Sequence, residues 1–147
     1  RESDVLSLGR RSDHQPPHTN VKAALCVANT LLTARLLLAM RPLATLAMHL
    51  DERKPGISIS CDEHALPGAV ELATLFMRYR PYFPHNYLCM LDSLALMHYL
   101  ARHKLRAMWV FGVREDPFLA HCWVQSGTVV LNDHADSTSA YTPIMVL

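Results

Sequence analysis

Apolar residues in the first two thirds of the chain recur with the spacing of helices. One apolar segment begins at Val21 and ends at Pro42, and a second runs from Pro67 to about Tyr79. Proline cannot continue a helix but suits its first turn, so these prolines mark boundaries. A third segment, residues 87–104, is apolar on nearly every side. Such a helix is typically buried, so we expect it at the centre of the fold.

Shorter apolar runs, separated by turn residues, follow in the last third. Residues 107–113 predict a strand, and residues 120–125 and 129–132 predict a hairpin around Ser126-Gly127. Residues 141–147 predict one more strand. Helices followed by antiparallel strands predict an α+β fold, with the buried helix ahead of the sheet.

The polar start of the chain has little to bury. Residues 1–20 carry arginines, prolines and polar residues, which predict a flexible tail or linker. A chain of 147 residues has the length of one domain, so we expect a single domain over residues 21–147. A helical piece over residues 43–50 and a short strand at residues 57–59 are further expectations.

The composition excludes several classes of protein. Half of the residues are hydrophobic, 18% are charged and the formal net charge is +1, which excludes a disordered polyelectrolyte and gives no electrostatic reason to expect nucleic acid. The longest uncharged run of the first apolar segment, Ala23–Ala34, is too short to span a bilayer, so we expect no integral membrane span. Four cysteines without a Cys-x-x-Cys pair favour free thiols in the reducing cytoplasm.

Nine histidines raise the question of a metal site. His14 and His18 have the spacing of one helical turn, but Pro16 and Pro17 between them prevent a helix. The chain has no His-Glu-x-x-His motif and no glycine-rich phosphate loop. We therefore expect neither a metal nor another cofactor.

Cys89 lies at the start of the predicted central helix. Asn86, three residues earlier, is a reasonable N-cap for that helix. The unpaired N–H groups and the dipole of a helix N-terminus stabilise a thiolate, and they also stabilise a developing oxyanion. We expect the backbone N–H of Cys89 to act as an oxyanion donor, with the Asn86 side chain as a second.

A nucleophilic thiol needs a base, and the base needs an orienting group. His121 and Asp133 lie on the two strands of the predicted hairpin. With a two-residue Ser126-Gly127 loop, His121 faces Asn132, and the Asp133 side chain points to the other side of the sheet. We therefore expect an odd-numbered loop or a bulge, which would set the imidazole and the carboxylate opposite each other.

Three runs of the sequence together carry a family resemblance. They are Tyr-Leu-Cys-Met-Leu-Asp-Ser-Leu-Ala-Leu (87–96), Phe-Gly-Val-Arg-Glu-Asp-Pro-Phe-Leu-Ala-His-Cys-Trp-Val (111–124) and Val-Leu-Asn-Asp (130–133). These runs resemble the leader peptidases of lasso-peptide biosynthesis, which belong to the transglutaminase-like, papain-related cysteine proteases. The resemblance implies a fold of that type. It also implies that Cys89 is the nucleophile, His121 the base and Asp133 the orienting acid.

The resemblance also implies a substrate and partners. The substrate would be a ribosomally made precursor peptide, from which the enzyme removes the leader. A small leader-recognition element, separate or fused upstream of Arg1, would bind the leader region. A cyclase that resembles asparagine synthetase would then close the ring.

The residues around His121 have less specific roles. Trp123 shares the face of His121 and would roof the site or fill the core, whereas Cys122 points to the opposite face and is expected to pack in the core. Arg114 and Phe118, in the loop before the histidine strand, would form a wall that the substrate touches.

Two other functions remain open from the sequence. A transglutaminase-like acyl transferase would use the same three residues with an amine in place of water. A leader-binding or scaffold partner of the cyclase would carry them without using them.

Overall fold

The computed structural model describes residues 20–42, 45, 65–83 and 88–147. The predicted tail over residues 1–19 and the strand at residues 57–59 lie outside the described residues. The helical piece over residues 43–50 also lies outside them, apart from Thr45.

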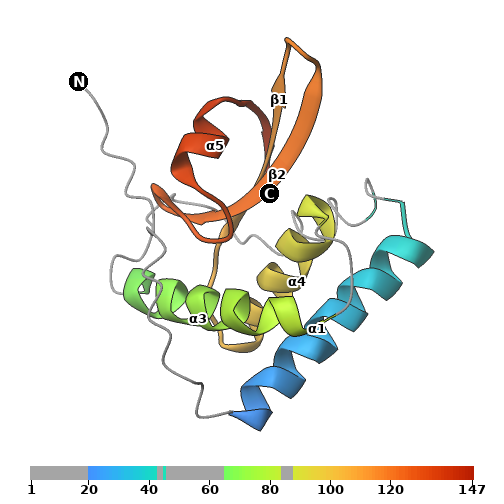
Figure 1. The fold of residues 1–147 in the computed structure, drawn as a ribbon, viewed down its shortest axis with the longest axis vertical. Helices are drawn as coiled ribbons and strands as arrows, with labels where there is room; N and C mark the ends of the chain where they lie inside the picture. Colours follow the sequence, from blue (N-terminus) through green and yellow to red (C-terminus); the bar gives the residue numbers. More distant parts are fainter. Residues whose placement is uncertain (1–19, 43–44, 46–64, 84–87) are drawn as a thin grey trace.

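Three long helices among the described residues gather at one end of the molecule (Figure 1). They confirm the three helices that the apolar spacing predicts. The Asn20 side chain caps the first by accepting a hydrogen bond from the Ala23 N–H. A short 3-10 turn, η1, follows the second helix because Pro81 prevents its continuation. The elements are α1 (Val21–Met40), α3 (Leu66–Tyr79), η1 (Arg80–Tyr82) and α4 (Cys89–Arg102).

A four-stranded antiparallel sheet completes the α+β fold predicted from the sequence. Its strands lie in the order β3-β2-β1-β4. A five-residue helix, α5, lies between the last two strands in the sequence and was not expected, because its polar residues carry no helical pattern. The elements are β1 (Met108–Arg114), β2 (Leu119–Ser126), β3 (Val129–Val130), α5 (Ala135–Ser139) and β4 (Thr142–Val146).

The helix α4 forms the centre of the core, as its apolar surface predicts. It packs against α1, α3 and the strands β1 and β2. Trp109 and Phe111 of β1 join this core, as do Cys122 and Val124 of β2. The alternate residues of the same strands, Val110 and Trp123 among them, form a second small cluster. The sheet therefore buries apolar side chains of both alternating sets.

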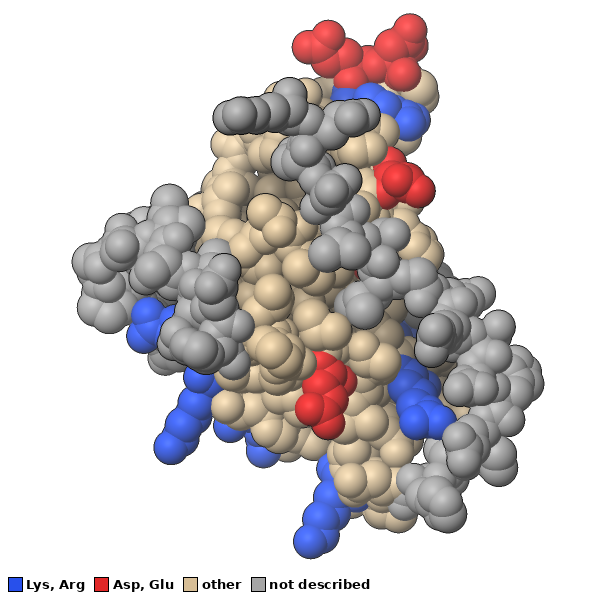
Figure 2. Space-filling view, turned by 90° about the vertical axis from the view of Figure 1, so that its left-hand side faces the viewer, with Lys and Arg blue, Asp and Glu red and all other residues tan. Residues whose placement is uncertain are grey.

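The helix α1 combines a buried side with an exposed apolar side. By length and composition alone it could cross a membrane. Its residues Ala23, Val27, Thr30, Leu31 and Ala34 are buried, and 28% of the apolar window is buried in all. Core helices of soluble proteins and signal sequences pass the same test. On the face shown in Figure 2, the visible charged side chains stand in small groups on a broad uncharged surface, in keeping with the net charge of +1.

Candidate active site

Cys89 is the first residue of α4. The N-cap is Leu88, in an extended conformation with φ −116° and ψ 118°, and its carbonyl accepts the Asp92 N–H at 2.9 Å. The prediction that Asn86 caps this helix is therefore wrong, and Asn86 itself lies outside the described residues. The leucine side chain cannot cap, so it leaves the first-turn N–H groups to stabilise negative charge near the sulfur.

A buried ion pair fixes the start of α4. Arg80 of η1 is fully buried, its Nε donates to Asp92 Oδ1, and its Nη1 donates to the Phe83 carbonyl at 3.2 Å. Burial raises the pKa of Asp92, while the hydrogen bond and the charge of Arg80 act against this rise. The pair ties the 3-10 turn to the first turn of the helix that carries Cys89. Sequence reasoning missed it, because no motif connects residues so far apart.

The hairpin that carries His121 has a different loop from the one predicted. Gly127 and Thr128 form a two-residue loop, and Ser126 pairs with Val129. Gly127 has a φ of 59°, which glycine adopts readily at the first position of such a loop. In this even-loop register a regular ladder would place Asp133 across from Cys122, so its side chain would point away from the imidazole.

His121 Nε2 nevertheless hydrogen-bonds Asp133 Oδ2. The expectation of an odd loop or a bulge is therefore wrong, because the strand pairing simply ends early. Its last backbone bond joins the Leu131 N–H to the Val124 carbonyl at 2.8 Å. The chain then leaves the sheet, and this departure frees the carboxylate to turn toward the imidazole.

Asn132 organises the point at which the chain leaves the sheet. Its side-chain oxygen accepts the Val124 N–H at 2.8 Å, in place of a backbone carbonyl. Its side-chain nitrogen donates to Ser93 Oγ at 2.9 Å, and Ser93 is fully buried on α4. The Asn132 side chain thus links α4, the helix of Cys89, to the segment that carries Asp133. The sequence contained both polar residues within its motifs, but nothing in it indicated that they touch.

The electrostatics favour a thiolate at Cys89 and a charged imidazole. A hydrogen bond with Cys122, together with the hydrogen bond and charge of His121, lowers the pKa of the Cys89 thiol to about 5 against the opposing effect of burial. Burial lowers the pKa of His121, but the hydrogen bonds and charges of Asp133 and Cys89 outweigh it and raise that pKa above its ordinary value. Both shifts favour the ionised pair, a Cys89 thiolate beside a His121 imidazolium.

This pair gives a testable alkylation profile. Because the thiolate is the reactive species, the rate at Cys89 should reach half its maximum near pH 5, the value to which the pKa is lowered. At pH 6, Cys89 should react with iodoacetamide roughly tenfold or more faster than Cys26 of α1. Peptide mass spectrometry after timed quenching measures both thiols in the same sample. Equal rates at the two cysteines would contradict an activated Cys89.

Two aromatic rings hold the imidazole of His121. Its ring centroid lies 6.0 Å from that of Trp123, nearly stacked, and 5.2 Å from that of Tyr141. Trp123 is only 3% exposed and donates its Nε1–H to Gln125 Oε1 at 2.9 Å. The structure thus confirms that Trp123 shares the face of His121 but leaves it little surface for a substrate.

Gly112, which pairs with His121 across the sheet, is required by this aromatic packing. A Cβ at Gly112 would lie 2.9 Å from Tyr141 Cβ and 3.0 Å from two ring atoms of Trp123. We expect Gly112→Ala to displace both rings, lower the free energy of unfolding by about 1–3 kcal/mol and slow Cys89 alkylation at pH 6. Urea unfolding and the alkylation assay measure the two effects.

Gly68 of α3 provides the matched control for that substitution. A Cβ there would meet Leu105 Cδ1 at 3.6 Å, an ordinary contact. Because alanine favours a helix, Gly68→Ala should keep or raise the stability and leave the alkylation rate unchanged. If both variants behaved alike, the aromatic packing over Gly112 would not matter for His121.

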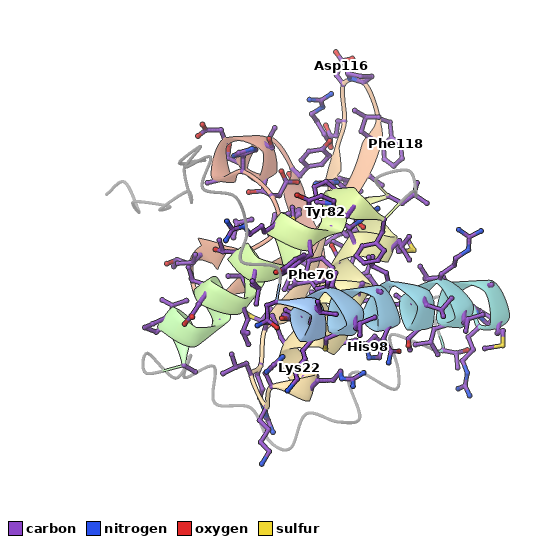
Figure 3. All side chains as sticks on the ribbon, turned by 60° about the horizontal axis from the view of Figure 1, so that its bottom comes forward. Lys22, Phe76, Tyr82, His98, Asp116 and Phe118 are labelled. Atoms are coloured by element: carbon purple, nitrogen blue, oxygen red, sulfur yellow. The ribbon has the colours of Figure 1, made fainter. Side chains whose placement is uncertain are left out.

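The two other predicted substrate-wall residues lie at different distances from the imidazole. Arg114 ends β1, and its guanidinium carbon lies 5.8 Å from the centroid of the Tyr141 ring that contacts His121. Phe118 is 72% exposed and lies with Asp116 at the far tip of the β1–β2 hairpin (Figure 3). Arg114 is therefore one ring away from the imidazole, whereas Phe118 points away from the body of the protein.

Cys122 lies in the core, as predicted, and is 3% exposed. Its sulfur also interacts with that of Cys89, which was not expected. This hydrogen bond and burial raise the pKa of the Cys122 thiol, so Cys122 stays protonated and can donate to the thiolate. Strand alternation correctly placed the residue on the face opposite His121, but it could not show that the first turn of α4 covers that face.

Within the described ranges, no group of three or more His, Cys, Asp or Glu side chains is placed to hold a metal ion.

The comparisons with known proteins give one result. The family model of the transglutaminase-like superfamily matches residues 28–146, which include Cys89, His121 and Asp133. Neither the curated proteins nor the solved structures yield a match. Since the family model covers most of the chain, the protein belongs to the transglutaminase-like superfamily.

Proposed function

We propose that the protein is a cysteine peptidase that removes the leader from a lasso-peptide precursor, with Cys89, His121 and Asp133 as its catalytic triad. Membership of the transglutaminase-like superfamily, whose members are generally cysteine-based enzymes, supports the coarse class. The observation that carries the proposal is the hydrogen bond between His121 and Asp133 beside a cysteine whose pKa His121 lowers. The lasso-peptide substrate rests on the sequence resemblance.

The three proposed catalytic side chains are partly exposed to solvent. The His121 and Asp133 side chains are 22% and 21% exposed, and Cys89 is partly buried. Because Asp133 occupies Nε2, the Nδ1 of the imidazole is left to face the thiol. Asp133 thereby orients the ring and stabilises its charged form.

In the acylation step, the Cys89 thiolate attacks the carbonyl carbon of the last leader residue. The carbonyl oxygen takes the negative charge, and the backbone N–H of Cys89 at the helix N-terminus would stabilise it. When the intermediate collapses, the C–N bond breaks and His121 gives its proton to the departing amine of the core peptide. The leader remains attached to Cys89 as a thioester.

Hydrolysis of the thioester restores the enzyme. His121, now neutral, takes a proton from water, and the hydroxide oxygen attacks the thioester carbonyl. The C–S bond then breaks, so the leader leaves with a free carboxylate and Cys89 returns as a thiolate. An amine in place of water would give an amide instead, which is the acyl-transfer alternative.

The proposal includes partners. A leader-recognition element, separate or fused upstream, would present the leader, and a cyclase that resembles asparagine synthetase would use the freed amine. These proteins and the reaction would be cytoplasmic. No nucleic acid takes part.

The test is incubation of the protein with the cognate precursor peptide, with and without the recognition element, and with methylamine added in a parallel sample. We expect mass spectrometry to find the core peptide and a leader that ends in a carboxylate, even with methylamine present. A methylamide at the end of the leader would instead favour acyl transfer. An intact precursor in every sample that contains the recognition element would favour the scaffold function.

A further inference from the structure

One buried thiol takes no part in the proposed peptidase reaction. This residue is Cys122, whose Sγ lies 4.0 Å from Ser93 Oγ. Ser93 follows Cys89 by four residues on α4, so the two side chains share one face of the helix. The Cys122 sulfur therefore lies against the face of α4 that Cys89 occupies, one helical turn from it, and each of the two thiols shifts the pKa of the other.

The surroundings of Cys122 are polar on one side as well. Ser93 Oγ, which lies beside the Cys122 sulfur, also donates to the Cys122 carbonyl at 3.3 Å. Trp109, fully buried on the neighbouring strand, packs in the same core. Cys122 is therefore held against α4 through both its sulfur and its carbonyl.

The two thiols also differ in access. Cys89 is partly exposed at the open site, whereas Cys122 is 3% exposed. A small oxidant from solvent therefore reaches Cys89 before Cys122. Accessible thiolates with a neighbouring resolving thiol are the typical arrangement of reversible cysteine oxidation.

We propose that Cys89 and Cys122 form an oxidative modification site, at which a hydroperoxide oxidises Cys89 and Cys122 then closes a reversible disulfide. This inference goes beyond the proposed peptidase function and does not depend on the identity of the substrate. The disulfide would block the nucleophile and protect it from irreversible oxidation.

The disulfide forms in two steps. The Cys89 thiolate attacks one oxygen of the hydroperoxide, the O–O bond breaks, and Cys89 becomes a sulfenic acid while the hydroperoxide is reduced to hydroxide or an alkoxide. Oxidation of Cys89 removes the thiolate that chiefly raises the pKa of Cys122, so the Cys122 thiol can give up its proton and attack the Cys89 sulfur. An S–S bond forms, the S–O bond breaks, and the hydroxide leaves as water with the Cys122 proton. A dithiol reverses the product by thiol–disulfide exchange.

The experiment uses the full chain with Cys26→Ala and Cys61→Ala, so that Cys89 and Cys122 are the only thiols. After treatment with one equivalent of hydrogen peroxide, we expect a monomer that is lighter by two hydrogens and has lost both free thiols. Peptide mapping should find the two cysteines joined. Dithiothreitol should restore the Cys89 alkylation rate to within about twofold.

Adding Cys122→Ala to this background supplies the control. Without the second thiol, Cys89 should advance to the sulfinic acid, and dithiothreitol should no longer restore its alkylation rate. Thermal unfolding checks that each variant is folded. The proposal is overturned if the protein with both thiols gains two oxygens at Cys89 as readily as the control, or if its disulfides are only intermolecular. The measurements of mass and of disulfide linkage on the two-thiol protein leave both Cys89 and Cys122 unsubstituted.

Discussion

Replacement of Cys89 by alanine should abolish leader cleavage while leaving the protein folded. Loss of the nucleophile in triad enzymes removes about 10⁴-fold or more of the rate, because no other group forms the acyl intermediate. Cys89 is only partly buried at the first position of α4, so removal of its sulfur costs little packing. The rate of core-peptide release by mass spectrometry, together with urea unfolding, measures both effects.

Cys26→Ala is the matched control for that prediction. Cys26 also lies on a helix and is also partly buried, but on α1. Its loss should leave the cleavage rate within about twofold of the native rate, since a thiol outside the site takes no part in the reaction. If a folded Cys89→Ala protein still released the core peptide at the native rate, the proposed triad would be wrong.

The identity of the candidate site residues was accessible from the sequence, but their geometry was not. A cysteine at a helix start, a histidine in a strand and an aspartate after the next strand are each recognisable by local pattern. The meeting of His121 with Asp133 depends on Asn132, which ends the strand pairing by bonding Val124 and Ser93. Strand register can be argued from loop length, whereas the point at which a ladder stops depends on side chains from another element.

The fold was likewise predictable only in part. The long helices follow from apolar periodicity and proline positions, and the α+β class follows from their order. The five-residue α5 and the Arg80–Asp92 pair did not follow, since a short polar helix and a buried charge pair leave no periodic trace. Both are fixed by tertiary contacts, which override local preference.

Two buried polar links thus hold α4, the helix of Cys89, from opposite sides. The pair of Arg80 and Asp92 ties the first turn of α4 to η1, and Ser93, the next residue along, ties it to Asn132. Adjacent residues of one helix therefore fix Cys89 relative to the chain before it and to the strands after it. The proposed triad would require such rigid placement of its side chains.

Removal of one partner of the first link should cost far more stability than removal of an exposed charge. Arg80→Met should lower the free energy of unfolding by about 3–5 kcal/mol, because it leaves the Asp92 carboxylate buried without its cation. Arg78→Met, at an exposed position two residues earlier on α3, should cost less than about 1 kcal/mol. Urea unfolding of both variants at pH 7 measures the difference.

The pH dependence of the unfolding free energy tests whether the buried charge of Asp92 causes the loss of stability in Arg80→Met. Burial already raises the pKa of Asp92 above its ordinary value of 3.8, and loss of Arg80 should raise it further. The folded variant then binds a proton that the unfolded chain releases, so its free energy of unfolding falls as the pH rises above 3.8. The deficit of Arg80→Met relative to the native protein should therefore be smaller at pH 4.5 than at pH 7.

In the double variant Arg80→Met, Asp92→Leu no buried charge remains, so most of the loss at pH 7 should be recovered. A deficit independent of pH, with no recovery in the double variant, would mean that Arg80 stabilises α4 through packing and its bond to Phe83 rather than through the ion pair.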